Sequence, residues 1–201
     1  MFQEILGKFK TKDAGVRDYL KEGSLFSALS REGVVLPREY EAFLLEFPQG
    51  LVFEEEVGVR GITSSPWAVE GIESISVFLG CDSSGINDLI KVRHVFADEL
   101  PSEYLVIGFP SSGENAPICL RVELEQAGGI YVWNRTSPKG SDSEEEFYLI
   151  SNDFSSLLSS LTRRPSRNSF PGQKPRLVSK YISPELDAKI RAHLASKASS
   201  K

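Results

Sequence analysis

The sequence predicts an α+β protein in which a mainly antiparallel central sheet of about five to six strands packs against helices. Apolar residues have helical spacing near the start of the chain and again before residue 161, whereas the segments between have the alternation of strands. The links between the last four predicted strands are short and contain no convincing helix. Because a parallel crossover needs a dozen or more residues, these strands are expected to form an antiparallel meander.

The clearest predicted helix lies in LPREYEAFLLEFPQG, residues 36–50. Pro37 suits the first turn of a helix, and Pro48 with Gly50 ends it. One or two further helices are predicted within the first 30 residues, where Gly23 interrupts the pattern. The apolar stripe of the clear helix repeats at the i, i+3, i+4 and i+7 positions, which are Tyr40, Phe43, Leu44 and Phe47.

Five later segments have the pattern of strands. In GIESISVFLG, Ile75, Val77 and Leu79 alternate with Ser74, Ser76 and Phe78, as expected for a strand with one buried face. The short run SEYLVIG is predicted to be a buried strand. The remaining strands are predicted in PICLRVEL, GIYVWN and EFYLIS.

A last core helix and an extension complete the predicted organisation. The segment NDFSSLLSSL returns to helical spacing, and Asn152 or Asp153 can cap this helix. We therefore predict one domain over residues 1–161, a Pro-rich and basic linker over 162–182, and a C-terminal helix over 183–198.

Composition indicates a soluble globular protein. The 201 residues suffice for one domain with a real core. No apolar run approaches the roughly 18 to 20 residues of a membrane helix, and the first residues lack the apolar core of a signal peptide. Cys81 and Cys119 have no CxxC spacing, so we expect reduced core cysteines in a cytoplasmic protein with no membrane partner.

Charge is distributed unevenly along the chain. Residues 1–160 contain 13 Lys and Arg against 26 Asp and Glu, a formal charge of −13. Residues 161–201 contain 10 Lys and Arg against 2 Asp and Glu, a formal charge of +8. An acidic body repels nucleic acid and attracts basic proteins, so no nucleic acid is expected to bind it. The basic tail can bind nucleic acid or an acidic partner, lie back on the body, or simply be solvated.

The sequence contains no convincing catalytic pattern. His94 and His193 lie outside any metal-ligand motif, and His94 is expected to be a surface or strand residue rather than a base. The G-x-x-x-x-G from Gly108 to Gly113 begins like a phosphate-binding loop, but Glu114 replaces the lysine and a strand follows instead of a helix. We interpret these glycines as hinges of a strand-to-strand turn. We predict no enzyme activity, no cofactor and no metal.

Acidic clusters and one tryptophan are the candidate partner-binding residues. Adjacent glutamates in loops are usually just solvated, and they bind divalent cations weakly; alternatively they recognise Arg and Lys on a partner. Trp133 is expected in the core, whereas Trp67 either contacts a partner or pins its own loop to the body. The candidate set is Glu54, Glu55, Glu56, Trp67, Glu114, Asp142, Glu144, Glu145 and Glu146.

Five motifs follow one another along the chain. They are LP-x-x-Y-x-x-F-L from Leu36, LPSEYLVIG from Leu100, ICL from Ile118, GGIYVWNR from Gly128 and SNDFSSLLSSL from Ser151. In this order they resemble the SUKH superfamily, which includes the yeast Smi/Knr cell-wall-synthesis regulator and many bacterial proteins. The resemblance covers roughly residues 30 to 161. The chain has Pro48-Gln49-Gly50 where the family often has Asn-Gly-Gly, and Asn134-Arg135-Thr136 where it often has Asp-His-Glu.

The resemblance implies a SUKH-like α+β fold and no known catalysis. Many bacterial members are immunity proteins, encoded beside polymorphic toxins that contact-dependent or type VI secretion systems deliver. They bind the cognate toxin, often a nuclease or another cytosol-acting enzyme, and block it. We therefore expect a monomeric, non-catalytic protein-binding module, an immunity protein whose toxin has a basic surface. The alternative is a regulatory scaffold of the cell-wall or signalling type, with the basic tail as its binding arm.

Overall fold

The computed structural model of the protein describes residues 2–14, 19–82, 85, 87–111, 115–122, 128–135 and 146–164, with the backbone alone at 19–24. The helices in these ranges are α1 (Phe2–Leu6), α2 (Tyr19–Arg31), α3 (Arg38–Glu46), α4 (Leu89–Val95) and α5 (Phe154–Ser159). The strands are β1 (Thr11–Asp13), β2 (Leu51–Arg60), β3 (Ile72–Phe78), β4 (Tyr104–Phe109), β5 (Ile118–Arg121), β6 (Ile130–Trp133), β7 (Phe147–Ser151) and β8 (Thr162–Arg163).

The strands form one antiparallel sheet. Its order from β1 to β7 follows the sequence, and β8 pairs with β2. The predicted α+β class and antiparallel meander are confirmed. The described sheet has eight strands, more than the five to six expected. The expected count was too low because β1 and β8 have only 3 and 2 residues, and because three glutamates interrupt the apolar pattern of β2.

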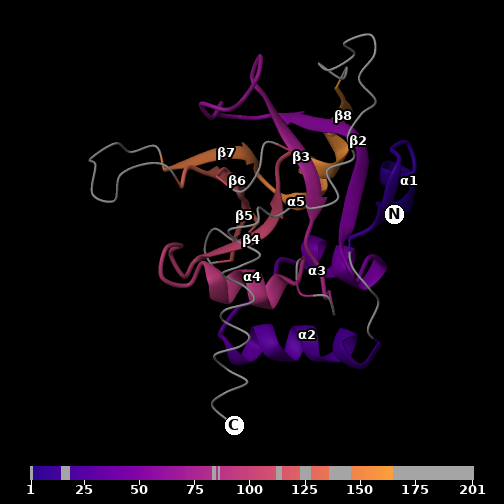
Figure 1. Cartoon of the computed structure of the whole chain (residues 1–201), viewed down its shortest axis with the longest axis vertical. Helices are drawn as coiled ribbons and strands as arrows, with labels where there is room; N and C mark the ends of the chain where they lie inside the picture. The colour runs from indigo at the N-terminus through magenta and orange to yellow at the C-terminus, as the bar shows by residue number, and fades with distance from the viewer. Residues whose placement is uncertain are drawn as a thin grey trace.

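The sheet is strongly twisted. In Figure 1, β2 and β3 run along the long axis of the view, whereas β7 runs across it. The loop after β2 reaches the far edge of the sheet, where Thr63 N and Oγ1 donate to Leu149 O over 2.8 and 3.1 Å. This contact joins the β2–β3 loop to β7, so the sheet wraps partly around on itself.

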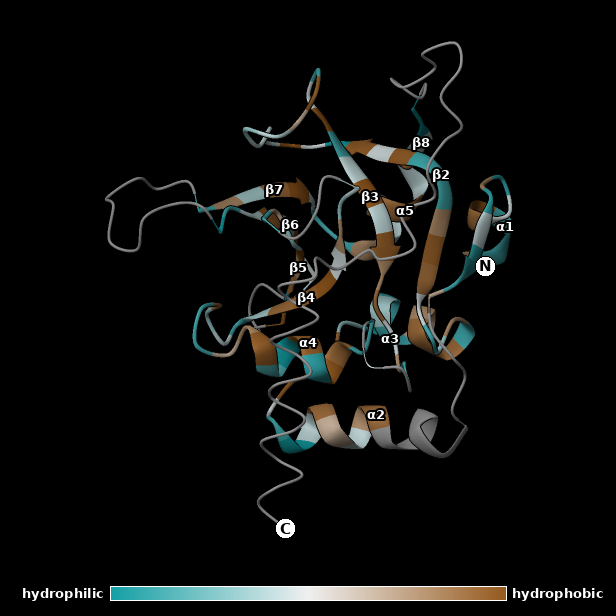
Figure 2. Cartoon of the chain, viewed as in Figure 1, coloured by the Kyte–Doolittle hydropathy of each residue, from teal (hydrophilic) through white to brown (hydrophobic). Residues whose placement is uncertain are grey.

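Aromatic side chains of α3, α5 and β3 form the centre of the core. The ring of Phe154 lies 4.9 Å from Tyr40, 5.1 Å from Phe43 and 5.3 Å from Phe78, all in edge-to-face geometry. Each of these side chains is at least 99% buried, and Figure 2 shows apolar stretches along α3 and β3. The stripe predicted on the helix of residues 36–50 therefore packs α3 against α5 and the sheet.

Helices α2 and α4 contact one another beside β4, below the sheet in Figure 1. The backbone of α2 continues through Gly23, so the predicted interruption does not end the helix. Helix α4 was not predicted from the sequence. Its N-terminus is capped by Asp88, whose Oδ1 accepts a hydrogen bond from Lys91 N over 3.0 Å, and it buries Leu89 and Val92.

Gly108 lies inside β4 and is not the hinge that we expected. It pairs with Phe78 of β3 on one side and Ile118 of β5 on the other. A Cβ at this position would collide with Val77 O, so glycine is required by the close approach of β3. The segment from β4 leads into strand β5, as predicted, while residues 112–114 lie outside the described ranges.

Other expectations concern individual residues and the tail. Trp133 is buried in the core, and Cys81 and Cys119 are buried free cysteines, all as predicted. The first two residues of the predicted linker form β8 against β2. The rest of the predicted linker and the predicted helix over 183–198 lie outside the described residues from 165 onward, and both stay predictions.

Candidate functional site

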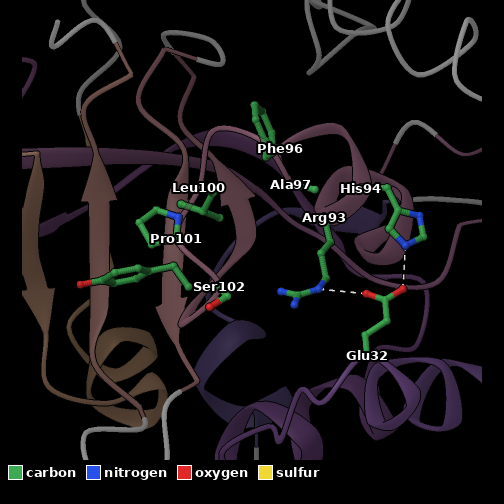
Figure 3. Close-up of a pocket in the computed structure, with 9 residues that line it drawn as sticks. Glu32, Arg93, His94, Phe96, Ala97, Leu100, Pro101 and Ser102 are labelled. Atoms are coloured by element: carbon green, nitrogen blue, oxygen red, sulfur yellow. Dashed lines mark hydrogen bonds and ion pairs between the residues drawn. The ribbon is translucent and has the colours of Figure 1, made fainter. Parts of the chain in front are cut away.

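A hollow of about 230 Å³ lies between the end of α2, helix α4 and the start of β4 (Figure 3). Its wall combines a guanidinium, an imidazole, a carboxylate and a hydroxyl with aromatic and aliphatic surface. A hollow of this size and mixed character suits one side chain of a protein partner or a small molecule. The lining residues are Glu32, Arg93, His94, Phe96, Ala97, Leu100, Pro101, Ser102 and Tyr104.

Glu32 holds two neighbouring side chains of α4. Arg93 Nε donates to Glu32 Oε2 over 2.9 Å, and His94 Nε2 lies 2.6 Å from Glu32 Oε1. Because one carboxylate contacts two consecutive residues of the helix, it fixes the orientation of both. The three side chains are partly exposed, so solvent screens the Arg93–Glu32 ion pair, which is worth only about 0.2–1 kcal/mol. His94 was expected at the surface or in a strand; it is partly exposed and lies in a helix.

The pocket continues into a row of aromatic rings on one face of β4, β6 and β7. We call Tyr104, Tyr131, Trp133 and Phe147 the aromatic band. The rings of Tyr104 and Phe147 are stacked, with centroids 4.1 Å apart, and Tyr131 meets Tyr104 edge-on at 5.5 Å. Trp133 lies parallel to Phe147 with centroids 6.2 Å apart. Trp133 is buried, whereas the other three side chains are half-buried, so part of each of those rings faces solvent.

Strand register explains why these side chains share a face. Cys119 pairs with Tyr131, and Trp133 pairs with Phe147. Residues directly opposite each other, and alternate residues along a strand, point to the same side of a sheet. One face of these strands packs against the helical core. The aromatic band lies on the opposite face, which is only partly covered.

Two arginines lie against the band. The Arg135 guanidinium is 4.8 Å from the ring centroid of Phe96 and 5.7 Å from that of Trp133. The same guanidinium donates to Glu99 Oε2 over 2.8 and 3.2 Å. The Arg121 guanidinium is 5.8 Å from the centroid of Tyr104. Cation–π contacts and the ion pair therefore hold the arginines next to the rings.

The Tyr104 hydroxyl stays a neutral donor and acceptor at neutral pH. Partial burial raises the pKa of Tyr104, although the positive charge of Arg121 acts in the opposite direction. A phenol beside an arginine is suited to polar contact with a partner, because the ring supplies apolar area while the hydroxyl remains able to form a hydrogen bond.

Among the predicted candidates that the structure describes, Glu146 has a direct contact with this band. It is exposed, and its Oε1 accepts a hydrogen bond from Trp133 Nε1 over 3.1 Å. The carboxylate therefore satisfies the indole N–H and places negative charge at the rim of the band. Asp142, Glu144 and Glu145 precede it in the sequence but lie outside the described residues, as does Glu114.

The three glutamates expected in a loop at 54–56 are part of strand β2, so this expectation was wrong. Glu54 and Glu56 are exposed, and Lys12 Nζ lies 3.2 Å from Glu54 Oε1. Glu55 is half-buried and accepts hydrogen bonds from Lys10 N over 2.7 Å and from Arg163 Nε over 3.1 Å. These residues therefore bind elements of the chain itself, and β3 to β6 lie between their strand and β7 in the sheet order.

Trp67 lies in the β2–β3 loop and is half-buried against the core. Its backbone N–H donates to Ser65 Oγ over 3.2 Å. Ser65 in turn donates through N and Oγ to the two carboxylate oxygens of buried Glu73, each over 2.9 Å. The Ser65–Glu73 hydrogen bonds thus anchor the loop to β3. Both alternatives for Trp67, a partner contact or a residue that pins the loop, stay predictions.

Metal-ligand clusters and membrane-crossing helices were searched for in the described residues. These ranges hold no group of three or more His, Cys, Asp or Glu side chains that could bind a metal ion. None of the described helices combines the length and apolar character that crossing a bilayer requires.

The fold and this site define a class of protein: an α+β domain with one curved antiparallel sheet and a partly exposed aromatic surface suited to recognising another protein. The family model for the SMI1 / KNR4 family (SUKH-1) matches residues 20–160, more than two thirds of the chain. The chain therefore belongs to this family. Comparison with curated proteins and with solved structures gave no match. At the family level, this membership supports the view that the chain is a protein-binding module with an immunity-type role. Members of the family are generally non-catalytic binding proteins.

Sequence reasoning missed the aromatic band and the pocket. In strands with one buried face, the alternation places Tyr131 and Phe147 on the solvent side. Aromatic residues expected at the surface were the signal in the sequence that could have indicated a binding surface. Glu32 directly follows the end of α2, whereas Arg93 and His94 lie in α4, about sixty positions later in the chain. No spacing rule connects them, because only the packing of α2 beside α4 brings them together.

Proposed function

We propose that this protein is an immunity protein that binds a cognate bacterial toxin and neutralises it by direct contact. The observation that carries the proposal is the aromatic band, a rigid and partly exposed set of rings with arginines beside it, in a protein of this family. Tyrosine, tryptophan and arginine are the residues that dominate protein–protein binding energies.

The geometry of the band favours slow dissociation. Tyr104 and Tyr131 are held by ring contacts within the protein, so little side-chain entropy remains to be lost when a partner covers them. The neighbouring hollow at Arg93 can receive one projecting side chain of that partner. Trp67, anchored in the β2–β3 loop, is proposed as a second apolar contact.

Carboxylates around the body are proposed to select a toxin with a basic surface. Glu54, Glu56 and Glu146 are exposed, although Glu54 also pairs with Lys12, and a negatively charged surface speeds association with a positively charged partner. A nuclease or another cytosol-acting effector fits, because enzymes that act on nucleic acid carry basic clefts. The other acidic residues proposed to contribute are Glu55, Glu114, Asp142, Glu144 and Glu145.

The proposal extends to the biological setting. A toxin delivered by a contact-dependent or type VI system would act in the cytoplasm of the receiving cell. The protein would then work there as a monomer, with no nucleic acid bound to its body, no cofactor and no catalytic step. Binding alone would block the toxin.

Co-expression tests the proposal. Each toxin domain encoded beside this gene is induced alone, with the wild-type protein, or with the Tyr131→Ala variant, and surviving cells are counted. Wild-type protein should restore survival for one toxin, and Tyr131→Ala should restore it less well. The control is Leu45→Ala, which removes a 67% exposed side chain of α3 outside the proposed site and should protect fully. Unchanged killing by every neighbouring toxin would refute the immunity role.

A regulatory scaffold remains the second candidate, favoured by the basic composition of the tail. Its first residues already pair with β2, so a scaffold would use the tail beyond Arg164 as its binding arm. Truncation after Leu161 separates the two candidates: a scaffold would lose its partner, whereas an immunity protein using the aromatic band would retain its toxin.

A further inference from the structure

The outer edge of β2 is covered by two short strands. β1 pairs with Leu51–Phe53, and β8 pairs with Val57 and Gly58. The backbone contacts extend onto two of the glutamates between these pairs: Glu54 N donates to Lys10 O over 2.8 Å, and Glu56 O accepts a hydrogen bond from Arg164 N over 2.9 Å. A long strand whose edge is covered by so little backbone is a ready template for pairing with another extended segment.

Backbone and side chains of β8 both engage this edge. Arg164 N donates to Glu56 O over 2.9 Å, and Thr162 Oγ1 donates to Gly58 O over 3.3 Å. Arg163 Nε donates to Glu55 Oε1 over 3.1 Å, and the same guanidinium donates to Lys8 O. An arginine in this strand therefore satisfies a carboxylate and a carbonyl at once.

The shape of the edge also fits an arginine. A Cβ placed on Gly58 would lie 2.7 Å from Arg164 Cδ, so the aliphatic stem of Arg164 runs directly over the glycine. The missing side chain of Gly58 leaves the space that the stem fills. Charge, hydrogen-bond pattern and shape thus all match an extended segment carrying two consecutive arginines.

The covering strand is weakly held. β8 has only 2 residues, both exposed, and the Arg163 side chain in the pair with Glu55 is 61% exposed. Segments with few buried contacts open at low free energy and can exchange with a competitor of the same chemistry.

We propose that the β2 edge from Glu54 to Gly58 is a docking groove for an extended, arginine-bearing strand of a protein partner. The chain's own Thr162–Arg164 occupies this groove and competes with the partner for it. The identification of the partner as a basic toxin rests on the proposed function. The groove and its internal competitor do not depend on that function. Because the competitor is tethered, it lowers the apparent affinity of any strand arriving from another chain.

A peptide with the sequence of residues 162–168, TRRPSRN, is the direct probe. Its binding to the full-length protein is measured by fluorescence anisotropy, for the wild type and for Arg163→Glu, in which repulsion from Glu55 opens the groove. The variant should bind the peptide about tenfold more tightly than the wild type. Adding Glu55→Gln to the variant should weaken binding again. Equal affinity of wild type and a folded Arg163→Glu variant would overturn the proposal.

A matched control separates strand docking from general charge attraction. The same peptide, N-methylated at the residue equivalent to Arg164, keeps its charge but loses the N–H that donates to Glu56 O. It should bind markedly less well; equal binding of both peptides would contradict docking as a strand.

The wild-type protein provides a second measurement that does not depend on any variant folding. Saturating TRRPSRN should displace β8, so the Arg164 amide of the protein should exchange with solvent faster, and the N-methylated peptide should have little effect. Unchanged exchange at saturation would contradict displacement. These assays contain no toxin, so a negative result would contradict the groove and not the proposed immunity role. A negative result in the toxin co-expression experiment would contradict the immunity role and not the groove.

Discussion

The rings of Tyr104 and Phe147 lie face to face, with centroids 4.1 Å apart and planes 6° apart, although β5 and β6 separate their strands in the sheet. Flat neighbouring strands are spaced by about 4.8 Å, which would hold these positions about 14 Å apart. The twist and curl of the sheet therefore bring the two rings together. The aromatic band exists before any partner arrives and is part of the folded domain.

Replacing Phe147 by alanine should destabilise the protein by about 2 kcal/mol, because a half-buried ring and its stacking contacts with Tyr104 and Trp133 are lost. Urea denaturation followed by tryptophan fluorescence measures this free energy of unfolding. Leu45→Ala, at an exposed site, should stay within about 0.5 kcal/mol of the wild type. If Phe147→Ala is as stable as Leu45→Ala, the band contributes nothing to the fold.

Tyr40 should make the protein sensitive to high pH. Complete burial raises the pKa of Tyr40 far above its ordinary value, and its hydroxyl donates to Leu79 O over 3.2 Å. Above about pH 10 the unfolded chain releases this proton while the folded chain keeps it, so stability falls as pH rises. This residue accounts for at most about 1.4 kcal/mol per pH unit.

The Tyr40→Phe variant isolates that contribution. At pH 8 it should be about 1 kcal/mol less stable than the wild type, because the buried hydrogen bond is missing. Between pH 10 and 11 its stability should fall less steeply than that of the wild type in parallel urea titrations. Identical slopes for the two proteins would show that Tyr40 does not control the alkaline transition.

Asp153 should be required for the start of α5. Its Oδ1 accepts a hydrogen bond from Ser156 N over 2.7 Å, and its Oδ2 accepts one from Ser156 Oγ over 2.6 Å. Asp153→Ala should cost about 1 kcal/mol in thermal unfolding, whereas Asp153→Asn, which keeps an acceptor, should cost less. An Asp153→Ala variant that unfolds at the same temperature as the wild type would show that this cap does not stabilise α5.

Much of the fold was predictable from apolar spacing alone. The stripe of α3 and the alternation in β3 to β7 reflect burial against one core, which sequence periodicity records directly. Strand β2 was not predicted because Glu54, Glu55 and Glu56 interrupt its apolar residues. The structure explains them: on its outer side β2 is covered only by the short strands β1 and β8, and the carboxylates of Glu54 and Glu55 bind Lys12 and Arg163 instead of the core.

The candidate site was far less predictable. The candidate glutamates of β2 and Glu146 lie on different parts of the sheet, while the aromatic band joins Tyr104 and Phe147 across two intervening strands. Such contacts depend on sheet curvature, which no local pattern encodes. The pairing of β8 was equally hidden, because two residues cannot display a strand period and their partner lies about a hundred positions earlier in the chain.

The central claim is that the aromatic band binds a partner protein. The most direct measurement is isothermal titration of the neighbouring toxin domain, in an inactive form, into wild-type protein, Tyr131→Ala and Leu45→Ala. The account predicts tight binding by the wild type and by Leu45→Ala, and a Kd at least about tenfold weaker for Tyr131→Ala with its fold intact by circular dichroism. A Tyr131→Ala variant that binds the toxin as tightly as the wild type would contradict it.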